Sequence, residues 1–240
     1  MCIRDSEYVN MESQKISTSR NWVINLNDAV ERYEPDPIRY TLTAIMPETS
    51  DSNFTWEEFV RRNNDELVAT FGNLVNRVLS MIHRNFDGVV PTQTSTGDAE
   101  LAINKLAESA LISISGSIEA CRFREGLSQS MSLAREVNRY LDDKAPWSAI
   151  KTDRESAAIT LVNSINIINC LKTVLHPYLP FSTQALQEML GLTGKVEANG
   201  WRWNPQEISG GHKLGKLERL FTKFDDSVVE EELNRIGSEA

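Results

Sequence analysis

A run of lysine and hydroxyl side chains near the start of the chain has the chemistry to handle a polyphosphate. Lys15-Ile16-Ser17-Thr18-Ser19 lies in a polar stretch that ends at Arg20. An ammonium group offsets the charge that develops on leaving phosphates, and hydroxyl and backbone N–H groups donate hydrogen bonds to phosphate oxygens. Hydroxyl-rich surface loops are common, so these residues by themselves favour a plain solvated loop.

A second set of polar side chains follows one side of a predicted helix. They recur at steps of four, three and four residues: Asn73, Arg77, Ser80 and Arg84. This spacing puts them on one face of the helix. An asparagine and an arginine one turn apart offer fixed donors and an acceptor, which suit the edge of an unstacked base. From spacing alone, a solvated helix face is the better explanation.

A tryptophan between two predicted helices is the third candidate. Trp147 follows Ala145-Pro146, and the proline restricts the backbone ahead of the ring. A tryptophan held at a loop tip can act as a platform on which an unpaired base stacks. A tryptophan packed between helices as part of the core is more common, so this residue alone also favours a structural role.

The elements that must position these residues are mainly helical. Residues 7–10 and 21–25 are expected to form short strands, and Asp36-Pro37 is expected to start a helix with the carboxylate as its cap. Thr55 and Glu58 form a capping box ahead of a long helical region. Its apolar residues recur at the helical period: Leu67, Phe71, Leu74, Val78 and Met81.

Together the patterns predict a mainly α fold in three parts. Residues 1–50 form a small α/β segment that carries the lysine-containing loop, and residues 51–192 form an antiparallel bundle of about five helices. Residues 193–240 form an irregular extension that includes Trp201, Trp203 and an acidic end. We expect the tryptophans to serve packing and the acidic end to be a solvated tail.

Composition limits the class of protein and leaves the function open. The 240 residues are 40% hydrophobic and 25% charged, which is ordinary for a soluble globular protein. No apolar run reaches the roughly 20 residues of a membrane helix, and no secretory signal is visible, so we expect a cytoplasmic protein without membrane contact. The formal net charge of −9 argues against a generic polyanion binder, although an acidic protein can still carry a basic face.

The cysteines indicate neither a disulfide framework nor a metal site. Cys2, Cys121 and Cys170 lie far apart with no paired spacing, so we predict no zinc knuckle and no metal ligands. Cys121 and Cys170 stand among apolar residues and are predicted to be buried. The sequence gives no indication of the oligomeric state.

Taken in order, the candidate residues and their surroundings resemble the methionyl-tRNA synthetases, a family of class I aminoacyl-tRNA synthetases. Lys15-Ile16-Ser17-Thr18-Ser19 resembles the Lys-Met-Ser-Lys-Ser signature of that class. Further stretches follow in the family's order: Tyr8 to Gln14, Asp36 to Tyr40, Met46 to Asp51, Phe54 to Trp56, Asn73 to Arg77, Phe86 to Gly88, Ala145 to Trp147, and His176 to Pro180. The resemblance covers roughly residues 7 to 192.

The resemblance implies roles for the three candidate sites. The signature loop would close over ATP, with Lys15 as a catalytic residue and Lys15, Ser17, Thr18 and Ser19 binding ATP. The bundle would read the CAU anticodon, with Asn73 and Arg77 contacting its first base and Trp147 stacking on that base. The implied partners are tRNA(Met), methionine and ATP with Mg²⁺. Arg39 matches a recurrent arginine of the family, and we assign it no chemical role.

Two departures from the family set the expectations. Thr18 replaces the usual second lysine of the signature, and we hypothesise that Lys15 or Arg20 covers part of its role. The 240 residues contain no His-Ile-Gly-His signature. We therefore expect the C-terminal part of a methionine–tRNA ligase, which by itself binds no ATP and catalyses no methionine-dependent pyrophosphate exchange. Residues 1–6 fit neither the family nor the strand that follows.

Three alternatives stay open at this stage. A sister synthetase with a helical anticodon domain would share the bundle, but the set Asn73, Arg77 and Trp147 favours a CAU reader. A stand-alone helical module that binds tRNA or another RNA, or a protein partner, without catalysis would fit the net charge, but it would not need the loop from Lys15 to Ser19. A helical scaffold without any nucleic-acid role would need neither the loop nor the polar face.

Overall fold

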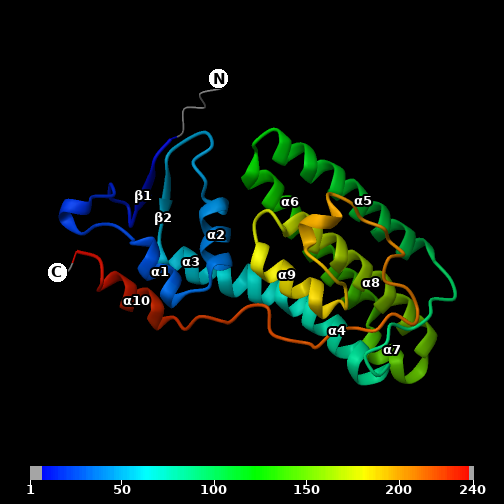
Figure 1. The fold of residues 1–240 in the computed structure, drawn as a ribbon. Coiled ribbons are helices and arrows are strands. Elements are labelled where there is room, and N and C mark those ends of the chain that lie inside the picture. Colours follow the sequence, from blue (N-terminus) through cyan, green and yellow to red (C-terminus); the bar gives the residue numbers. More distant parts are fainter. Residues whose placement is uncertain (1–6, 238–240) are drawn as a thin grey trace.

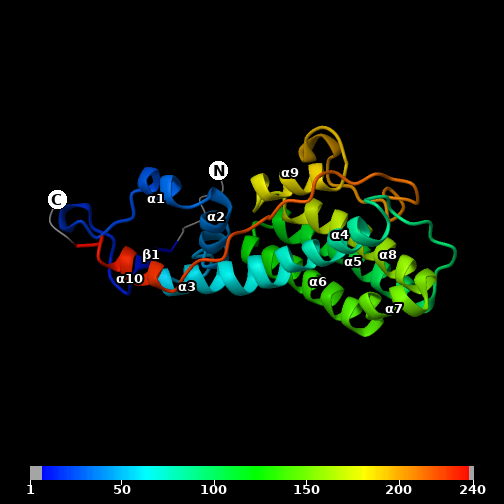
Figure 2. The ribbon, with the colours of Figure 1, turned by 90° about the horizontal axis from the view of Figure 1, so that it is seen from below.

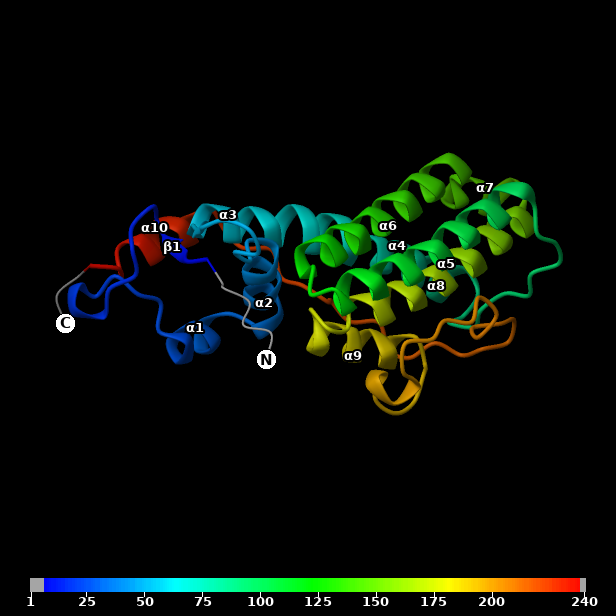
Figure 3. The same cartoon turned by 90° about the horizontal axis from the view of Figure 1, so that it is seen from above.

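The structure is a computed structural model that describes residues 7–237, and it is elongated (Figure 1). A small α/β segment lies at one end and a helix bundle at the other, with one long helical rod crossing between them (Figure 3). This arrangement confirms the predicted mainly α fold with a helix bundle.

The α/β segment has two short parallel strands. β1 (Val9–Met11) pairs with β2 (Ser52–Phe54), and Asn10 faces Asn53 in the register. Between the strands lie a 3₁₀ turn, η1 (Thr18–Arg20), and two helices, α1 (Leu26–Arg32) and α2 (Pro35–Ala44). The strand expected at residues 21–25 is wrong. Asn21 has a left-handed backbone (φ 50°), which turns the chain where a strand would have to stay extended.

A separate aromatic core holds this segment together, and it continues past residue 50. Its buried residues come from β1, the residue after α2, β2 and α3 (Trp56–Arg61): Met11, Ile45, Phe54, Trp56, Phe59 and Val60. The rings of Phe54 and Trp56 meet edge to face at 5.2 Å between centroids. The partner of β1 and much of this core therefore follow residue 50, where the sequence suggested that the bundle begins.

The helical rod is continuous from Trp56 to Asn85. It consists of α3, a π-helical stretch η2 (Arg62–Gly72) and α4 (Asn73–Asn85). Only the Thr55 half of the predicted capping box is confirmed, since Thr55 Oγ1 accepts a hydrogen bond of 3.1 Å from the backbone N–H of Glu58, whereas the Glu58 carboxylate pairs with Arg61 and Arg62. Within the wider π turns Thr70 Oγ1 donates to the carbonyl of Asp65 at 2.8 Å. The sequence periodicity predicted a helix here but not its widening.

Five further helices complete the bundle, and one of them, α8 (Arg154–Leu175), is buried at its centre. They are α5 (Asp98–Glu119), α6 (Phe123–Lys144), α7 (Pro146–Thr152), α8 and α9 (Pro180–Met189), and α4 packs on α6 and α8. In the described part of the chain, α8 alone is long and apolar enough to cross a membrane, but 89% of its apolar window is buried inside the bundle. α8 is thus the core helix on which the others pack (Figure 2).

Two residues of α2 join the α/β segment to the bundle. Asp36 does not cap its own helix, which begins one residue earlier at Pro35. Its buried Oδ2 accepts a 2.6 Å hydrogen bond from the backbone N–H of Ser182, in the first turn of α9. Arg39 donates to the carbonyls of Pro177 and Tyr178 at 3.0 and 3.2 Å, in the turn after α8. The two side chains therefore fix α2 against the junction of α8 and α9.

The C-terminal extension returns along the molecule from the bundle to the α/β segment (Figures 1 and 2). After η3 (Val196–Asn199), Trp201 and Trp203 pack on the bundle as expected, and Trp203 Nε1 donates to the carbonyl of Asn166 at 2.7 Å. The chain then runs extended to α10 (Ser227–Leu233), which packs on α3. The expected solvated tail is wrong for α10, because Glu232 is buried there.

The cysteines differ from expectation at one position. Cys170 is buried in α8, where burial raises the pKa of its thiol to about 12. Cys121 is exposed in the turn between α5 and α6, with a φ of 56°. Its apolar neighbours belong to helix faces on either side, so they do not bury the turn itself. Cys2 lies outside the described residues.

Candidate phosphate loop and nucleic-acid interface

The lysine-containing loop is closed at its base by backbone hydrogen bonds. Ser17 and Trp22 exchange two of them, at 2.9 and 2.8 Å, and the N–H of Asn21 donates to the carbonyl of Thr18 at 3.1 Å. Trp22 Nε1 donates to the carbonyl of Met11 at 2.8 Å, which ties the loop to the end of β1. The backbone is therefore ordered by local bonds even though the side chains point outward.

The loop side chains themselves lie in solvent. Lys15, Thr18 and Ser19 are exposed, and Ser17 Oγ lies 3.2 Å from Ser19 Oγ. Arg20 Nη2 donates to the carbonyl of Lys15 at 3.4 Å, so the second cation of the loop is folded back toward the first. Within residues 7–237, the Lys15 ammonium has neither a hydrogen bond nor an ion pair in the structure. The loop thus offers exposed hydroxyls and, in Lys15, a cation that the described part of the fold does not use.

The structure brings two of the predicted recognition residues together. The guanidinium carbon of Arg77 lies 4.8 Å from the ring centroid of Trp147. Arg77 comes from α4 and Trp147 from the first turn of α7, with 41% of the tryptophan exposed. Trp147 is not at a loop tip as expected. Ala145 adopts a left-handed conformation (φ 40°) that ends α6, and Pro146 starts α7 at once.

Two residues of α6 hold Arg77 in this position. Arg77 Nη2 donates to Asp142 Oδ1 at 2.6 Å and Nη1 donates to Asn138 Oδ1 at 3.3 Å. The Asn138 amide is itself fixed, because its Nδ2 donates to the carbonyls of Thr70 and Ala134 at 3.0 and 3.1 Å. We call Arg77, Trp147, Asn138 and Asp142 the stacking platform. A guanidinium held over an indole gives a preformed surface for an aromatic base.

The end of α6 that precedes Trp147 is anchored by a buried carboxylate. Glu100 of α5 accepts hydrogen bonds from the Tyr140 hydroxyl and the Lys144 ammonium, each at 2.8 Å. Burial by itself would raise the pKa of Glu100, but these bonds hold that pKa below its usual value. Because Lys144 is the last residue of α6, the anchor fixes the start of α7 and therefore the tryptophan.

Asn73 lies on the same face of α4 as Arg77 but is not part of the contact between Arg77 and Trp147. It is exposed one helical turn before Arg77, and it lines a hollow of about 290 Å³ together with Asn76, Phe221 and Lys223. Ser80 Oγ hydrogen bonds to Asn76 Oδ1 at 3.2 Å, and Arg84 is exposed further along α4. The polar face of α4 is therefore open, with the platform on one side and the returning extension on the other.

Sequence reasoning missed Asn138 and Asp142. One signal was available, since Asn138 falls on the apolar stripe of α6, where an asparagine requires hydrogen-bond partners. Nothing local pointed to Asp142, which looks like any charged residue at a helix end. The loop and the platform lie at opposite ends of the molecule (Figure 1).

Comparisons with known proteins identify the family of the chain. Residues 2–79 match the family described as tRNA synthetases class I (M), and residues 90–240 match the anticodon binding domain of methionyl tRNA ligase. With the fold, these matches define the class: a class I aminoacyl-tRNA synthetase with its anticodon-binding bundle. Within this class, the chain belongs to the methionyl-tRNA ligase family.

Individual relatives give the extent of the match. The chain is 41% identical to methionine–tRNA ligase of Chloroflexus aurantiacus and 43% identical to that of Dehalococcoides mccartyi, in each case over 98% of this chain. It spans only 43% and 42% of the two relatives. The solved Mycobacterium tuberculosis methionyl-tRNA synthetase in complex with methionyl-adenylate superposes with a TM-score of 0.81 at 24% identity, over 89% of this chain and 42% of that one, which supports the fold.

Proposed function

We propose that the chain is the tRNA-reading and signature-loop portion of a cytoplasmic methionine–tRNA ligase. The observation that carries the proposal is the stacking platform, in which Arg77 is held over Trp147 by Asn138 and Asp142. In the complete reaction, ATP adenylates methionine and the methionyl group passes to tRNA(Met). This portion would read the CAU anticodon and supply the loop for the ATP phosphates.

The platform suits a base that is already unpaired. Bases of an anticodon loop can be splayed out at little cost, and an aromatic surface contributes on the order of 1–3 kcal/mol per stacked base. We propose that Trp147 stacks on the first anticodon base while Asn73 and Arg77 read its edge. Asn73 lies exposed one turn before Arg77, and the Arg77 side chain is held by two α6 residues before any ligand arrives. Such preorganisation lowers the entropic cost of binding.

The loop would act on the phosphates of ATP. Lys15 would stabilise the leaving pyrophosphate, and Ser17, Thr18 and Ser19 would donate hydrogen bonds to phosphate oxygens. Arg20 is exposed five residues from Lys15 and folded toward it, which supports Arg20 as the second cation in place of a lysine at position 18. The stretch from Lys15 to Arg20 contains no carboxylate, so the Mg²⁺ that accompanies ATP would not be bound by this loop.

The test is the binding of the purified chain to tRNA(Met) and to the same transcript with its first anticodon base changed, each at two salt concentrations. Base reading predicts a preference for CAU that persists when salt is added, because stacking and edge hydrogen bonds depend less on counterion release than phosphate contacts do. Equal and salt-sensitive binding to both transcripts would overturn the reading function. It would leave a stand-alone RNA-binding module as the better explanation.

A further inference from the structure

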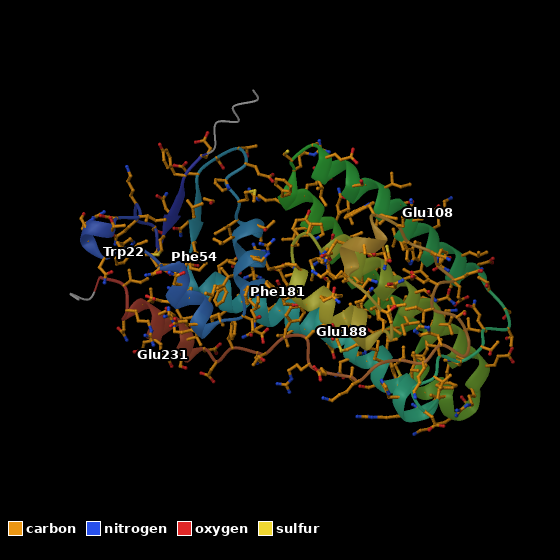
Figure 4. The ribbon with its side chains drawn as sticks, in the orientation of Figure 1. Trp22, Phe54, Glu108, Phe181, Glu188 and Glu231 are labelled. Atoms are coloured by element: carbon orange, nitrogen blue, oxygen red, sulfur yellow. The ribbon has the colours of Figure 1, made fainter. Side chains whose placement is uncertain are left out.

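The end of the chain returns to the base of the phosphate loop. The backbone N–H of Gly237 donates to the carbonyl of Asn21 at 3.0 Å, and Gly237 lies against the Trp22 ring. Ile236 packs with Trp22 on the aromatic core of the α/β segment. Figure 4 labels Trp22 at the loop and Glu231 on the helix that approaches it. Residues more than 200 positions apart in the sequence thus meet at the residues that close the loop.

A buried carboxylate holds the returning segment. Glu232 of α10 forms a two-bond pair with Arg32 of α1, with Nε to Oε1 at 2.7 Å and Nη2 to Oε2 at 3.0 Å. The Tyr33 hydroxyl donates to the same Oε1 at 2.8 Å, and the Glu232 side chain is only 3% exposed. Paired and buried in this way, the carboxylate has its charge matched, and removing it would leave the Arg32 guanidinium without its partner.

Packing adds a second attachment at the start of the segment. Phe224 stacks on Phe59 at 5.2 Å between ring centroids and meets the Tyr33 ring edge to face at 5.3 Å. Asn64 holds the backbone of Phe224 from both sides, accepting from its N–H and donating to its carbonyl, each at 2.9 Å. The segment is therefore fixed by its aromatic end, by its helix and by its last described residue.

We infer that residues 224–237, the C-terminal clasp, set the position of the phosphate loop, and that Glu232 is the positioning residue that keeps the clasp in place. The loop turn closes through Ser17, Asn21 and Trp22, and two of these three contact the clasp. Releasing α10 removes the support on the clasp side of the turn and leaves the local bonds of the loop and the bond from Trp22 to Met11. The clasp is distinct from the phosphate chemistry, and only its value to catalysis depends on the function proposed above.

The experiment compares the chain with its Glu232→Gln variant by amide hydrogen exchange and by limited trypsin cleavage. Exchange at the hydrogen-bonded amides of Ser17, Asn21 and Trp22, and cleavage after Lys15 and Arg20, both require the turn to open. We expect each rate to rise on the order of tenfold in the variant, because the buried carboxylate that holds Arg32 loses its charge. Exchange in α8 should stay unchanged. Glu230→Gln, which makes the same charge change at an exposed position of α10, should behave like the parent.

A general loss of stability would accelerate exchange in α8 as well as in the loop. In that event Tyr33→Phe, which removes one hydrogen bond to Glu232 and no packing volume, replaces the first variant in the same measurement. Faster exchange of α10 together with an unchanged loop would overturn the inference. Neither readout uses ATP or tRNA, so a failure here is separate from a failure of the proposed anticodon reading.

Discussion

The phosphate loop and the stacking platform differ in how their functional side chains are held. At the platform, Arg77 has Asp142 and Asn138 as partners and an indole beneath it, and Asn138 is fixed by two further carbonyls. At the loop, the backbone is ordered by hydrogen bonds while Lys15 and Thr18 extend into solvent. At the platform the functional side chains are held by partners, whereas at the loop it is mainly the backbone that is held.

The difference follows from what each region would bind. An unpaired base needs a rigid surface, and rigidity comes from side-chain partners within one bundle. A polyphosphate brings its own charge, so the cations that receive it need no partner beforehand, and a partner carboxylate would compete with it. The comparison therefore predicts that substitutions in the loop act on chemistry, whereas substitutions at the platform act on binding.

The largest effect is expected at Lys15. In a methionine–tRNA ligase that carries this sequence, Lys15→Met should slow adenylate formation roughly 100- to 1,000-fold, because a charged donor to the developing pyrophosphate is lost. Pyrophosphate exchange measures this rate, and tRNA binding by the same variant should be unchanged. Lys195→Met, at a side chain 79% exposed in the extension, serves as the matched control. An unaltered exchange rate for Lys15→Met would remove the loop from the proposed chemistry.

The next effect is expected at Trp147. Trp147→Ala should weaken binding of tRNA(Met) roughly tenfold to hundredfold, since one stacked base is lost. Fluorescence anisotropy with a labelled transcript measures the change, and the preference for the first anticodon base should fall with it. Phe181→Ala removes another aromatic, 63% exposed at the start of α9, and should bind like the parent. Equal affinity of Trp147→Ala and the parent for tRNA(Met) would exclude the platform as the recognition site.

Local patterns predicted the parts of both regions that depend on neighbouring residues. The loop from Lys15 to Ser19 and the turn of helix from Asn73 to Arg77 are contiguous or periodic, so their residues could be chosen from spacing and resemblance. The Thr55 half of the capping box was predicted for the same reason and is confirmed.

What the sequence did not predict depends on contacts between distant residues. Asn138 and Asp142 lie 61 and 65 positions from Arg77, and Glu232 lies 200 positions from Arg32. A carboxylate before a proline suits the cap of its own helix, yet Asp36 accepts its hydrogen bond from α9, 146 positions away. No local propensity encodes such pairs, since they exist only after the bundle has formed.

A smaller effect is expected at Asn138, where the comparison can be sharpened without touching a base-contacting residue. Asn138→Ala removes one acceptor from Arg77 and leaves Asp142 in place, so tRNA binding should weaken about fivefold, corresponding to about 1 kcal/mol for one hydrogen bond. The same anisotropy assay measures it. Gln129→Ala, on the same helix but near its other end, should leave the affinity unchanged. A loss as large as that of Trp147→Ala would mean that Asn138 supports the whole platform and not only the guanidinium.

The smallest effect is a pH dependence of stability that is expected in the bundle but not in the loop. Lys172 of α8 is 3% exposed, and burial lowers the pKa of its ammonium to about 8. The unfolded chain, with a lysine pKa near 10.4, binds more protons above pH 8, so this residue makes stability rise with pH in that range.

The expected gain in unfolding free energy from this one residue is about 1 kcal/mol between pH 7 and pH 9. Denaturant unfolding of the parent and of Lys172→Met at both pH values isolates it, because other groups, including the buried Cys170 thiol, titrate alike in the two proteins. The gain should be absent from Lys172→Met. Exchange rates in the loop, corrected for the intrinsic effect of pH, should not follow the gain, since Lys15 is exposed and its region has a separate core. If loop exchange rates followed the change in unfolding free energy, the two cores would unfold as one unit. The order of the loop would then depend on the folded bundle.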